Sequence, residues 1–434
     1  MRLPRSLQGL PREVGVLAAI AFCVALGFGI LIPALPVFAR TFGVSIFESS
    51  LVISAFALVR LVTAPLAGTL VNRLGERWVL SSGLLIVAVS SAAAGLSQSF
   101  VQLLVLRGIG GLGSTMFSVS AMALLLRVVD QDNRGRATGA YQGGFLLGGV
   151  AGPAVGGLVI AWSVRAPFFV YAVTLLAATA VALLFLRNVG SPTGSSPLSD
   201  SVSSPEARQD APTSRLEELR AALRLKAYRA ALGVNIVSGF VLFGLRSALI
   251  PIFVVEALHQ SASLAGVGFL LAAGSQAVLL LPAGRWADTR GRRPAMTIGI
   301  VALLVGMLLV VTADVTSDDM SGGAVPALVL FLVAMAVQGV ASAFLGSSPA
   351  AVVGDVLAGR RGGIVVATFQ MVGDLGTVVG PLVAGLLVDQ FDFRWAFAAA
   401  AGLAAGVAIL VLRMPETLRA SSVKRSSVSS DVGA

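Results

Sequence analysis

The sequence predicts an all-α membrane protein whose twelve spanning helices form two similar six-helix bundles. Three observations predict this class. The 434-residue chain is 56% hydrophobic and only 12% charged, whereas soluble domains carry about 25% charged residues. Its apolar residues gather in segments of about 20 residues or more, the length needed to cross a hydrocarbon core of about 30 Å. Short motifs of the first half return at matching places in the second half.

Twelve apolar segments have the required length. The first is longer than the apolar part of a signal peptide, and no small-residue cleavage site follows it, so we expect it to stay in the membrane. The expected spans are 14–38, 47–71, 79–97, 101–127, 137–163, 166–187, 230–255, 262–285, 295–314, 325–353, 363–388 and 393–413.

Polar segments divide the chain into five regions. The central polar segment starts with a Ser- and Pro-rich stretch typical of a flexible linker. From about Ser214 it carries the alternating charges of a short amphipathic helix that lies on a membrane surface. The regions are a cytoplasmic N-terminus 1–13, a first bundle 14–187, the linker 188–229, a second bundle 230–413 and a cytoplasmic tail 414–434.

The distribution of basic residues predicts the orientation. Lys and Arg are retained in cytoplasmic loops, and 25 of the 31 lie in segments on one side of the predicted membrane. The exceptions are Arg40, Arg165 and Arg394 on the other side and Arg60, Arg107 and Arg246 inside spans. We therefore expect a plasma-membrane protein with both ends in the cytoplasm. This asymmetry explains the net charge of +10 without a nucleic-acid partner.

One loop motif occurs in each half, after the second and after the eighth span. This loop motif and the glycine–proline motif described next each recur after nearly the same number of residues, which indicates an internal duplication. Transporters use such a duplication to build two bundles around a central site. We name these two segments the latch loops. Their candidate residues are Gly68, Asn72, Arg73 and Gly75 in the first copy and Gly284, Asp288, Arg290, Gly291 and Arg292 in the second.

The second repeated motif is a glycine–proline pattern in the fifth and eleventh spans. Glycines four residues apart leave a flat strip that lets helices approach closely, and proline permits a bend. One interpretation is a role in the coupling between the two halves; the other is simple packing of spans five and eight. The residues are Gly148, Gly152, Pro153, Gly156 and Gly157, matched by Gly376, Gly380, Pro381 and Gly385.

These motifs resemble those of the major facilitator superfamily over the whole membrane part of the chain. The second latch loop follows the family's loop signature well, and the first departs from it at Asn72, where the family usually has Asp. Arg107 and the glycines after it resemble a second signature, and the Gly152-Pro153 segment resembles that of drug:proton antiporters. The resemblance implies the major facilitator fold and proton-driven export by a twelve-helix monomer.

The latch loops have two interpretations. Their basic residues hold the loops in the cytoplasm, which is a role in topology alone. Alternatively, the Asp288 carboxylate lies at the positive N-terminus of a neighbouring helix, which by the family's symmetry is the start of the fifth span. Asn72 brings no charge, so we expect the latch of the first half to be the weaker one.

The charged residues inside spans are candidate coupling groups, because a charge in mid-bilayer usually faces a cavity or a partner. Arg60 of the second span and Asp374 of the eleventh both lie near the midplane, and the resemblance implies that these spans pack together. We expect an Arg60–Asp374 ion pair with a role in proton coupling or gating, or a static one that fixes assembly. The family signature implies a coupling role for Arg107, against a side chain that only extends to the interface.

The resemblance implies that spans one, four, seven and ten line a central cavity. Arg246 either meets the substrate there, pairs with Asp374 or extends outward. Glu48 and Glu256 lie near outer span ends and are expected to be solvated. The apolar character of the lining favours lipophilic solutes, cationic ones included, over sugars. The cavity candidates are Arg246, Phe28, Phe117, Asn235, Phe243, Gln338 and Phe344.

The expected function is that of a secondary transporter and not of an enzyme. Cys23 and His259 are the only residues of their types, so we expect no metal and no cofactor, and no nucleophile or phosphate-loop pattern is present. The expected partners are a small-molecule substrate, protons and the bilayer. Export of lipophilic drug-like or metabolite solutes in exchange for protons is the preferred interpretation. The alternative is proton-coupled import of a small metabolite, and a non-transporting sensor is a third.

Overall fold

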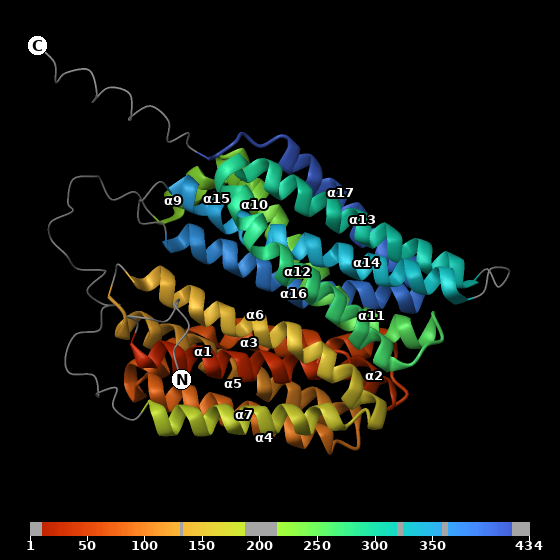
Figure 1. The fold of residues 1–434 in the computed structure, drawn as a ribbon, viewed down its shortest axis with the longest axis horizontal. Coiled ribbons are helices and arrows are strands. Elements are labelled where there is room, and N and C mark those ends of the chain that lie inside the picture. The colour runs from red at the N-terminus through yellow and green to blue at the C-terminus, as the bar shows by residue number, and fades with distance from the viewer. Residues whose placement is uncertain (1–10, 131–132, 187–214, 319–323, 358–362, 419–434) are drawn as a thin grey trace, which may run out of the picture.

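The computed structural model describes residues 11–130, 133–186, 215–318, 324–357 and 363–418. This part of the chain contains 12 helical segments that are long and apolar enough to cross a membrane, which confirms the all-α, twelve-span prediction. The two sets of six spans form two bundles that lie side by side (Figure 1).

The first bundle contains the first six spans, and a short helix, α9 (Arg215–Arg224), precedes the second bundle. Its helices are α1 (Arg12–Leu31), α2 (Leu35–Arg40), α3 (Ile46–Leu74), α4 (Glu76–Gly95), α5 (Phe100–Val128), α6 (Arg134–Trp162) and α7 (Ala166–Phe185). The second bundle comprises α10 (Lys226–Val237), η4 (Ser238–Leu245), α11 (Arg246–Glu256), α12 (Ala262–Arg290), α13 (Arg292–Asp318), α14 (Ala324–Leu345), α15 (Ser348–Leu357), α16 (Gly363–Gln390) and α17 (Phe393–Leu412).

Three spans that the sequence predicts as single helices are interrupted. The first span changes from α1 to α2 through a turn at Pro33, which has no N–H to donate to the preceding turn. The seventh changes from α10 to a π-helical segment, η4, and then to α11. The tenth is divided into α14 and α15. Such interruptions in a membrane are tolerated where neighbouring protein surrounds the backbone.

Both described ends of the chain lie at the same end of the molecule (Figure 1). We call this the basic end, because it carries Arg12 and the latch loops with Arg73, Arg290 and Arg293. The opposite end, with α2 and the turn after α11, is the far end. At the basic end, Gly75 and Gly291 terminate α3 and α12 with φ angles of 83° and 119°, a left-handed backbone that favours glycine.

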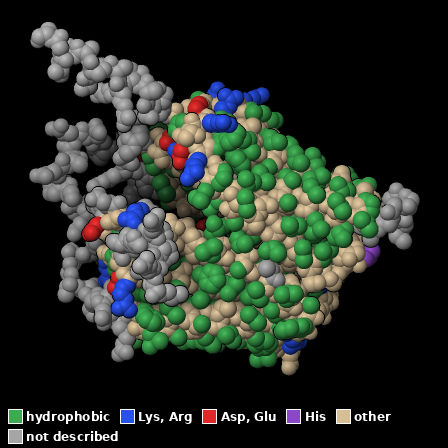
Figure 2. All heavy atoms as spheres, in the orientation of Figure 1, with side chains coloured by type: hydrophobic (Ala, Val, Ile, Leu, Met, Phe, Trp, Pro, Cys, Tyr) green, Lys and Arg blue, Asp and Glu red, His purple; other side chains and the backbone are tan. Residues whose placement is uncertain are grey.

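Each bundle has its own apolar core. Phe38 and Phe168 are fully buried in the first, and Phe253, Phe331 and Phe397 in the second. The outer surface is also apolar, as Figure 2 shows for one face. Trp162 is 86% exposed near the far end, where an indole ring suits the membrane–water interface. A surface of this kind is solvated by lipid.

The glycine strip of α6 packs against α1, within its own bundle. A methyl group on Gly152 would lie 2.6 Å from the Leu26 carbonyl oxygen, and one on Gly156 would lie 2.8 Å from the Ile30 carbonyl oxygen. The backbones therefore touch where side chains are absent. Packing of Gly152 and Gly156 with the eighth span, one of the two interpretations of the strip, is therefore wrong.

The repeated strip of the eleventh span behaves in the same way in the second bundle. Gly376 and Gly380 of α16 face the backbone of the seventh span, at Ile236 and Phe240. The internal duplication of the sequence thus includes a duplicated helix contact, between the first and fifth spans of each bundle. Gly385 of the second strip differs, because a methyl group there would lie 2.7 Å from the Cα of Phe47 in α3 of the other bundle.

Candidate functional site

The two bundles are separated at the basic end and touch at the far end. Figure 2 shows a hollow between them that opens at the end carrying the termini. Such a hollow between two related bundles is where transporters of repeated architecture bind their solutes. We therefore describe its closed end first and its interior second.

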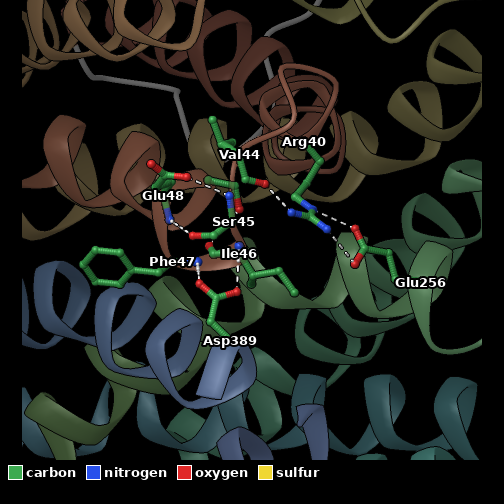
Figure 3. Close-up of polar contacts among 9 residues, drawn as sticks. Arg40, Val44, Ser45, Ile46, Phe47, Glu48, Glu256 and Asp389 are labelled. Atoms are coloured by element: carbon green, nitrogen blue, oxygen red, sulfur yellow. Dashed lines mark hydrogen bonds and ion pairs between the residues drawn. The ribbon is translucent and has the colours of Figure 1, made fainter. Parts of the chain in front are cut away.

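An ion pair joins the bundles at the far end. Arg40, the last residue of α2, donates from Nε to Glu256 at 2.8 Å and from Nη2 at 3.1 Å, and Glu256 is the last residue of α11. Figure 3 shows the two side chains pointing toward each other from the two bundles. Glu256 is partly exposed, as expected of a residue near an outer span end, but its pairing across the bundles was not expected.

Asp389 of α16 makes the second far-end contact. Its carboxylate accepts hydrogen bonds from the backbone N–H groups of Ile46 at 2.9 Å and Phe47 at 2.8 Å (Figure 3). These are the first N–H groups of α3, where the helix dipole favours negative charge. Ser45 and Glu48 form a capping box on the same turn, so Glu48, expected only to be solvated, also stabilises the start of α3. A carboxylate of one bundle therefore caps a helix of the other.

Two more contacts close the far end. The Ser54 hydroxyl of α3 donates to the Val378 carbonyl oxygen of α16 at 2.8 Å. A methyl group on Gly157 of α6 would lie 3.0 Å from the Ser263 carbonyl oxygen, and Gly266 of α12 lies against Gly157 as well. The Pro153 carbonyl oxygen would lie 3.1 Å from a methyl group on Gly266, so Gly157 and Pro153 are the residues of the α6 strip that meet the eighth span.

Arg60 and Asp374 lie on α3 and α16 with exposed side chains. These helices pack together across the bundles, as the resemblance implied. The charge of Arg60 acts on the Asp374 carboxylate across the two bundles. Within the described residues the two side chains form no direct ion pair. The expected Arg60–Asp374 contact is therefore not made in this conformation.

Arg107 of α5 is buried within the first bundle. Its side chain is only 2% exposed, and the guanidinium lies 4.4 Å from the centre of the Phe56 ring. Its Nε has no hydrogen-bond acceptor among the described residues. Arg107 does not extend to the interface, which removes that alternative and leaves its coupling role as a prediction.

Arg246 and Phe243 are among the less buried residues of the seventh span, which contacts α3, α12, α14 and α16. Phe243 is 63% exposed although its helix is surrounded by other spans. Arg246 is partly exposed, and its guanidinium lies 5.9 Å from the centre of the Phe269 ring of α12. Among the ion pairs of the described residues there is none between Arg246 and Asp374, and the buried Nε of Arg246 shows that its side chain does not extend outward. Of its three predicted roles, contact with the substrate remains.

Several predicted cavity residues serve helix packing instead. Gln338 is 0% exposed and packs against Gly306 of α13. Phe344 belongs to a small core between α12 and α13. Asn235 donates to the Phe369 carbonyl oxygen at 2.6 Å. Gln338 and Phe344 are buried, so for them the cavity prediction is wrong in this conformation, whereas it stays a prediction for Asn235, which is partly exposed.

The aromatic candidates of the first bundle are also packed. Phe117 is buried and lies beside the Phe145 ring. Phe28 is partly buried and stacks with Phe56 at a ring-centre distance of 6.1 Å. Phe28 thus contacts the ring that covers Arg107, and because it is partly exposed its place in the cavity stays a prediction.

The second latch loop is engaged within its own bundle. Asp288 forms an ion pair with Arg292, and Arg292 also contacts Asp355 at 3.3 Å. The Arg290 guanidinium lies over the Trp286 ring. The described partner of Asp288 is thus a residue of its own loop, and the predicted contact with the start of α6 is not among the described contacts.

The first latch loop faces open space. Asn72 and Arg73 are exposed, and a methyl group on Gly68, or on Gly284 of the second loop, would meet nothing within 4 Å. Because the bundles are separated at the basic end, Gly68 and Gly284 of the two latch loops have no neighbour from the other bundle within this distance. Within the described ranges, no group of three His, Cys, Asp or Glu residues could hold a metal ion.

Solved structures with the same fold include several transporters. The nucleoside transporter NupG superposes with a TM-score of 0.68 at 16% identity, over 92% of this chain and 98% of that one. A POT family transporter in complex with 5-aminolevulinic acid gives a TM-score of 0.75 at 10% identity, over 93% and 96%. These likenesses show the fold.

Curated relatives match over part of their length. The quinolone resistance protein NorA of Staphylococcus aureus (strain MRSA252) is 29% identical over 158 residues, 36% of this chain and 41% of the relative. Multidrug resistance protein 2 of Bacillus subtilis (strain 168) is 27% identical over 172 residues, 40% and 43% of the two chains. The matches thus span about two fifths of these relatives.

The family model for the Major Facilitator Superfamily matches residues 17–247 and again residues 231–431. The two matches fall on the two bundles and together span nearly the whole chain. This chain therefore belongs to the Major Facilitator Superfamily, a family of secondary transporters of small molecules and not of enzymes.

Proposed function

We propose that this transporter exports lipophilic drug-like or metabolite solutes in exchange for protons, by alternating access. The observation that carries the proposal is the hollow between the bundles, open at the basic end and closed at the far end (Figure 2). Basic residues mark the cytoplasmic side. In that orientation the conformation accepts a solute from the cytoplasm, and rocking of the bundles delivers it outside.

The apolar face of the seventh span supports a lipophilic solute. Ile236, Phe240 and Phe243 are each partly or largely exposed on that face. A sugar would need many hydrogen-bonding groups, which this face does not offer. The relatives whose names refer to quinolone and multidrug resistance support the same direction of transport, over the two fifths of their length that match.

Proton coupling is assigned to Asp374 together with Arg60 and Arg107. A carboxylate in mid-membrane can take up a proton from one side and release it on the other. Asp374 lies on the exposed face of α16 and Arg60 acts on it electrostatically. Closure of the bundles at the basic end would change the distance between Arg60 and Asp374. The proton affinity of Asp374 would therefore differ between the two conformations, which couples proton binding to transport.

Transport in energised cells tests the proposal. An efflux-deficient bacterial host is loaded with a panel of lipophilic dyes, and efflux is followed after glucose addition. We expect efflux above that of the empty-vector host, which collapses when an uncoupler is added. Uncoupler-sensitive accumulation of a metabolite would instead establish the importer, and no movement in either direction would overturn transport altogether.

A further inference from the structure

The seventh span carries a stripe of less buried side chains that ends at an arginine. Ile236, Phe240, Phe243 and Arg246 are exposed or partly exposed, whereas most residues between them are buried. Beyond this stripe every residue of Ala248–Val254 is buried, because the far end is closed there. Arg246 therefore lies at the closed end of the hollow, the deepest place that a solute from the basic end can reach.

Arg246 has no anionic partner in the described part of the chain. Its buried Nε has no hydrogen-bond acceptor, and its nearest charge-stabilising contact is the Phe269 ring at 5.9 Å. A cation–π contact at this distance is weak. An unpaired guanidinium away from bulk water is costly and usually marks a functional site.

The charge balance of the membrane interior leaves Arg246 uncompensated. Among the described residues, the central parts of the spans carry Arg60, Arg107, Arg246 and Asp374. The carboxylate of Asp374 lies within electrostatic range of Arg60, so its charge offsets that guanidinium first. Arg107 is enclosed under Phe56 in the other bundle. The positive charge of Arg246 is thus left for an anionic group of a bound solute to compensate.

We propose that the transported solute carries an acidic group, and that Arg246 binds this group. A guanidinium offers two parallel N–H donors that match a carboxylate, and Phe240 and Phe243 offer an apolar surface on the same face for the rest of the solute. The proposal rests on the proposed function and narrows its substrate class to lipophilic organic acids. The apolar lining alone had admitted cationic solutes, and the charge balance reverses that preference.

Three fluorescent probes that share one apolar group test the charge preference. Dansylglycine is an anion, dansylglycinamide is neutral and N-dansylethylenediamine is a cation at neutral pH. Each is titrated into purified protein in lipid nanodiscs, and binding is read from the dansyl emission. We expect wild type to bind the anion about 10–100-fold more tightly than the amide, as a charge-assisted hydrogen-bond pair predicts, and the cation least tightly.

Variants assign the preference to Arg246. Arg246→Gln should bind the anion and the amide equally, and Arg246→Lys should keep part of the preference because it keeps the charge. Phe243→Leu is the matched control, because it changes the apolar surface beside Arg246 and should weaken all three probes by a similar factor. Melting curves verify that each variant is folded.

The outcomes separate this proposal from the proposed function. A wild type that binds the anion no better than the amide, or a preference that survives in Arg246→Gln, overturns the acidic-group proposal even if dyes are exported. Arg246-dependent binding of the anion without its movement across inverted vesicles establishes the anion site and overturns export. Export of the anion that Arg246→Gln abolishes, with amide export retained, supports both.

Discussion

At the scale of single residues, Asp374 is the group on which proton coupling depends in our proposal. Asn at this position keeps the shape and loses the exchangeable proton, whereas Glu keeps it. We expect Asp374→Asn to bind solute and to exchange it downhill, but to lose export driven by a pH gradient, and Asp374→Glu to retain part of it. Measurement of uptake into inverted vesicles with an imposed gradient checks this.

The matched control for Asp374 is Asp392→Asn. The Asp392 carboxylate accepts a hydrogen bond from the Phe393 N–H at 2.7 Å at the start of α17, outside the hollow. Gradient-driven export should survive this change. Full gradient-driven export in Asp374→Asn would end the assignment of the proton to this carboxylate.

Glu416 offers a test of pH dependence outside the membrane. Burial raises its pKa, but hydrogen bonds from the backbone N–H groups of Leu418, Arg292, Arg293 and Thr417 outweigh this effect and lower its pKa below the ordinary value of 4.5. The folded state therefore prefers the charged form. The resulting stability is complete above pH 4.5 and is lost as the pH falls through the lowered pKa.

We expect Glu416→Gln to weaken the attachment of the chain after α17 to the start of α13 at neutral pH. The effect is about 1 kcal/mol, because the carboxylate is largely exposed. Hydrogen exchange of the Arg292 and Arg293 amides, compared between the two proteins at each pH, measures it. The difference should vanish in acid, and a difference that persists below the lowered pKa would contradict the carboxylate as its cause.

Sequence reasoning located the functional charges but not their contacts. Arg60, Arg107, Arg246 and Asp374 stand out because charges inside apolar spans are rare. Which way a side chain points depends on the rotation of its helix, which the sequence does not determine. Gln338 was therefore placed in the cavity, although it faces α13. The contact of Asp389 with α3 could not be predicted, because in a sequence a carboxylate at the end of a span looks the same whether it is solvated or caps another helix.

At the scale of helices, the strips of glycine decide how closely α1 and α6 approach. A methyl group on Gly148 would meet the Phe22 carbonyl oxygen and lie 2.7 Å from the Leu26 backbone nitrogen. Gly149, the next residue, would meet nothing within 4 Å. We expect Gly148→Ala to lower the free energy of unfolding by about 1–3 kcal/mol, the usual cost of overpacking.

Gly149→Ala serves as the neighbouring control. It should leave the stability unchanged or raise it by roughly 0.5–1 kcal/mol, because alanine favours a helix over glycine. Thermal unfolding in detergent, followed by intrinsic fluorescence, compares the two variants. Equal effects of the two substitutions would show that helix propensity, and not the α1–α6 contact, sets the stability.

The helices themselves were predictable, and their interruptions were not. Twenty apolar residues predict a span from transfer energetics alone. The turn at Pro33 follows from its missing N–H, although the apolar run alone predicts one continuous span through it. The π-helical segment η4 has no such marker. Segments of this type occur often at functional sites, and η4 leads directly into Arg246, which a regular helix would orient differently.

At the scale of the whole molecule, opening of the far end requires several contacts to break together. The Arg40–Glu256 pair is about one third exposed on both sides, and exposed ion pairs contribute about 0–1 kcal/mol. Asp389 contributes more specifically, because its carboxylate accepts two N–H groups at a helix N-terminus, where a helix N-cap stabilises by about 1 kcal/mol. We therefore expect Asp389 to be the principal polar lock of this end.

Removal of that lock should change the balance between the two conformations without altering the solute site. Asp389→Asn keeps the size of the side chain but lacks the charge and one acceptor, so a loss of about 1 kcal/mol would favour the conformation open at the far end roughly fivefold. Spin labels on the exposed residues Gln98 and His259, in a Cys23→Ser background, report the separation of the bundles there. The longer-distance population should grow in Asp389→Asn and remain unchanged in Asp392→Asn, whose carboxylate caps α17 within its own bundle.

A similar growth in both variants would mean that loss of a far-end charge, and not the α16–α3 contact, controls the opening. No growth in either would mean that Asp389 is not the lock, and that the contacts left intact, Arg40–Glu256, Ser54–Val378 and Gly157–Gly266, suffice to hold the end closed.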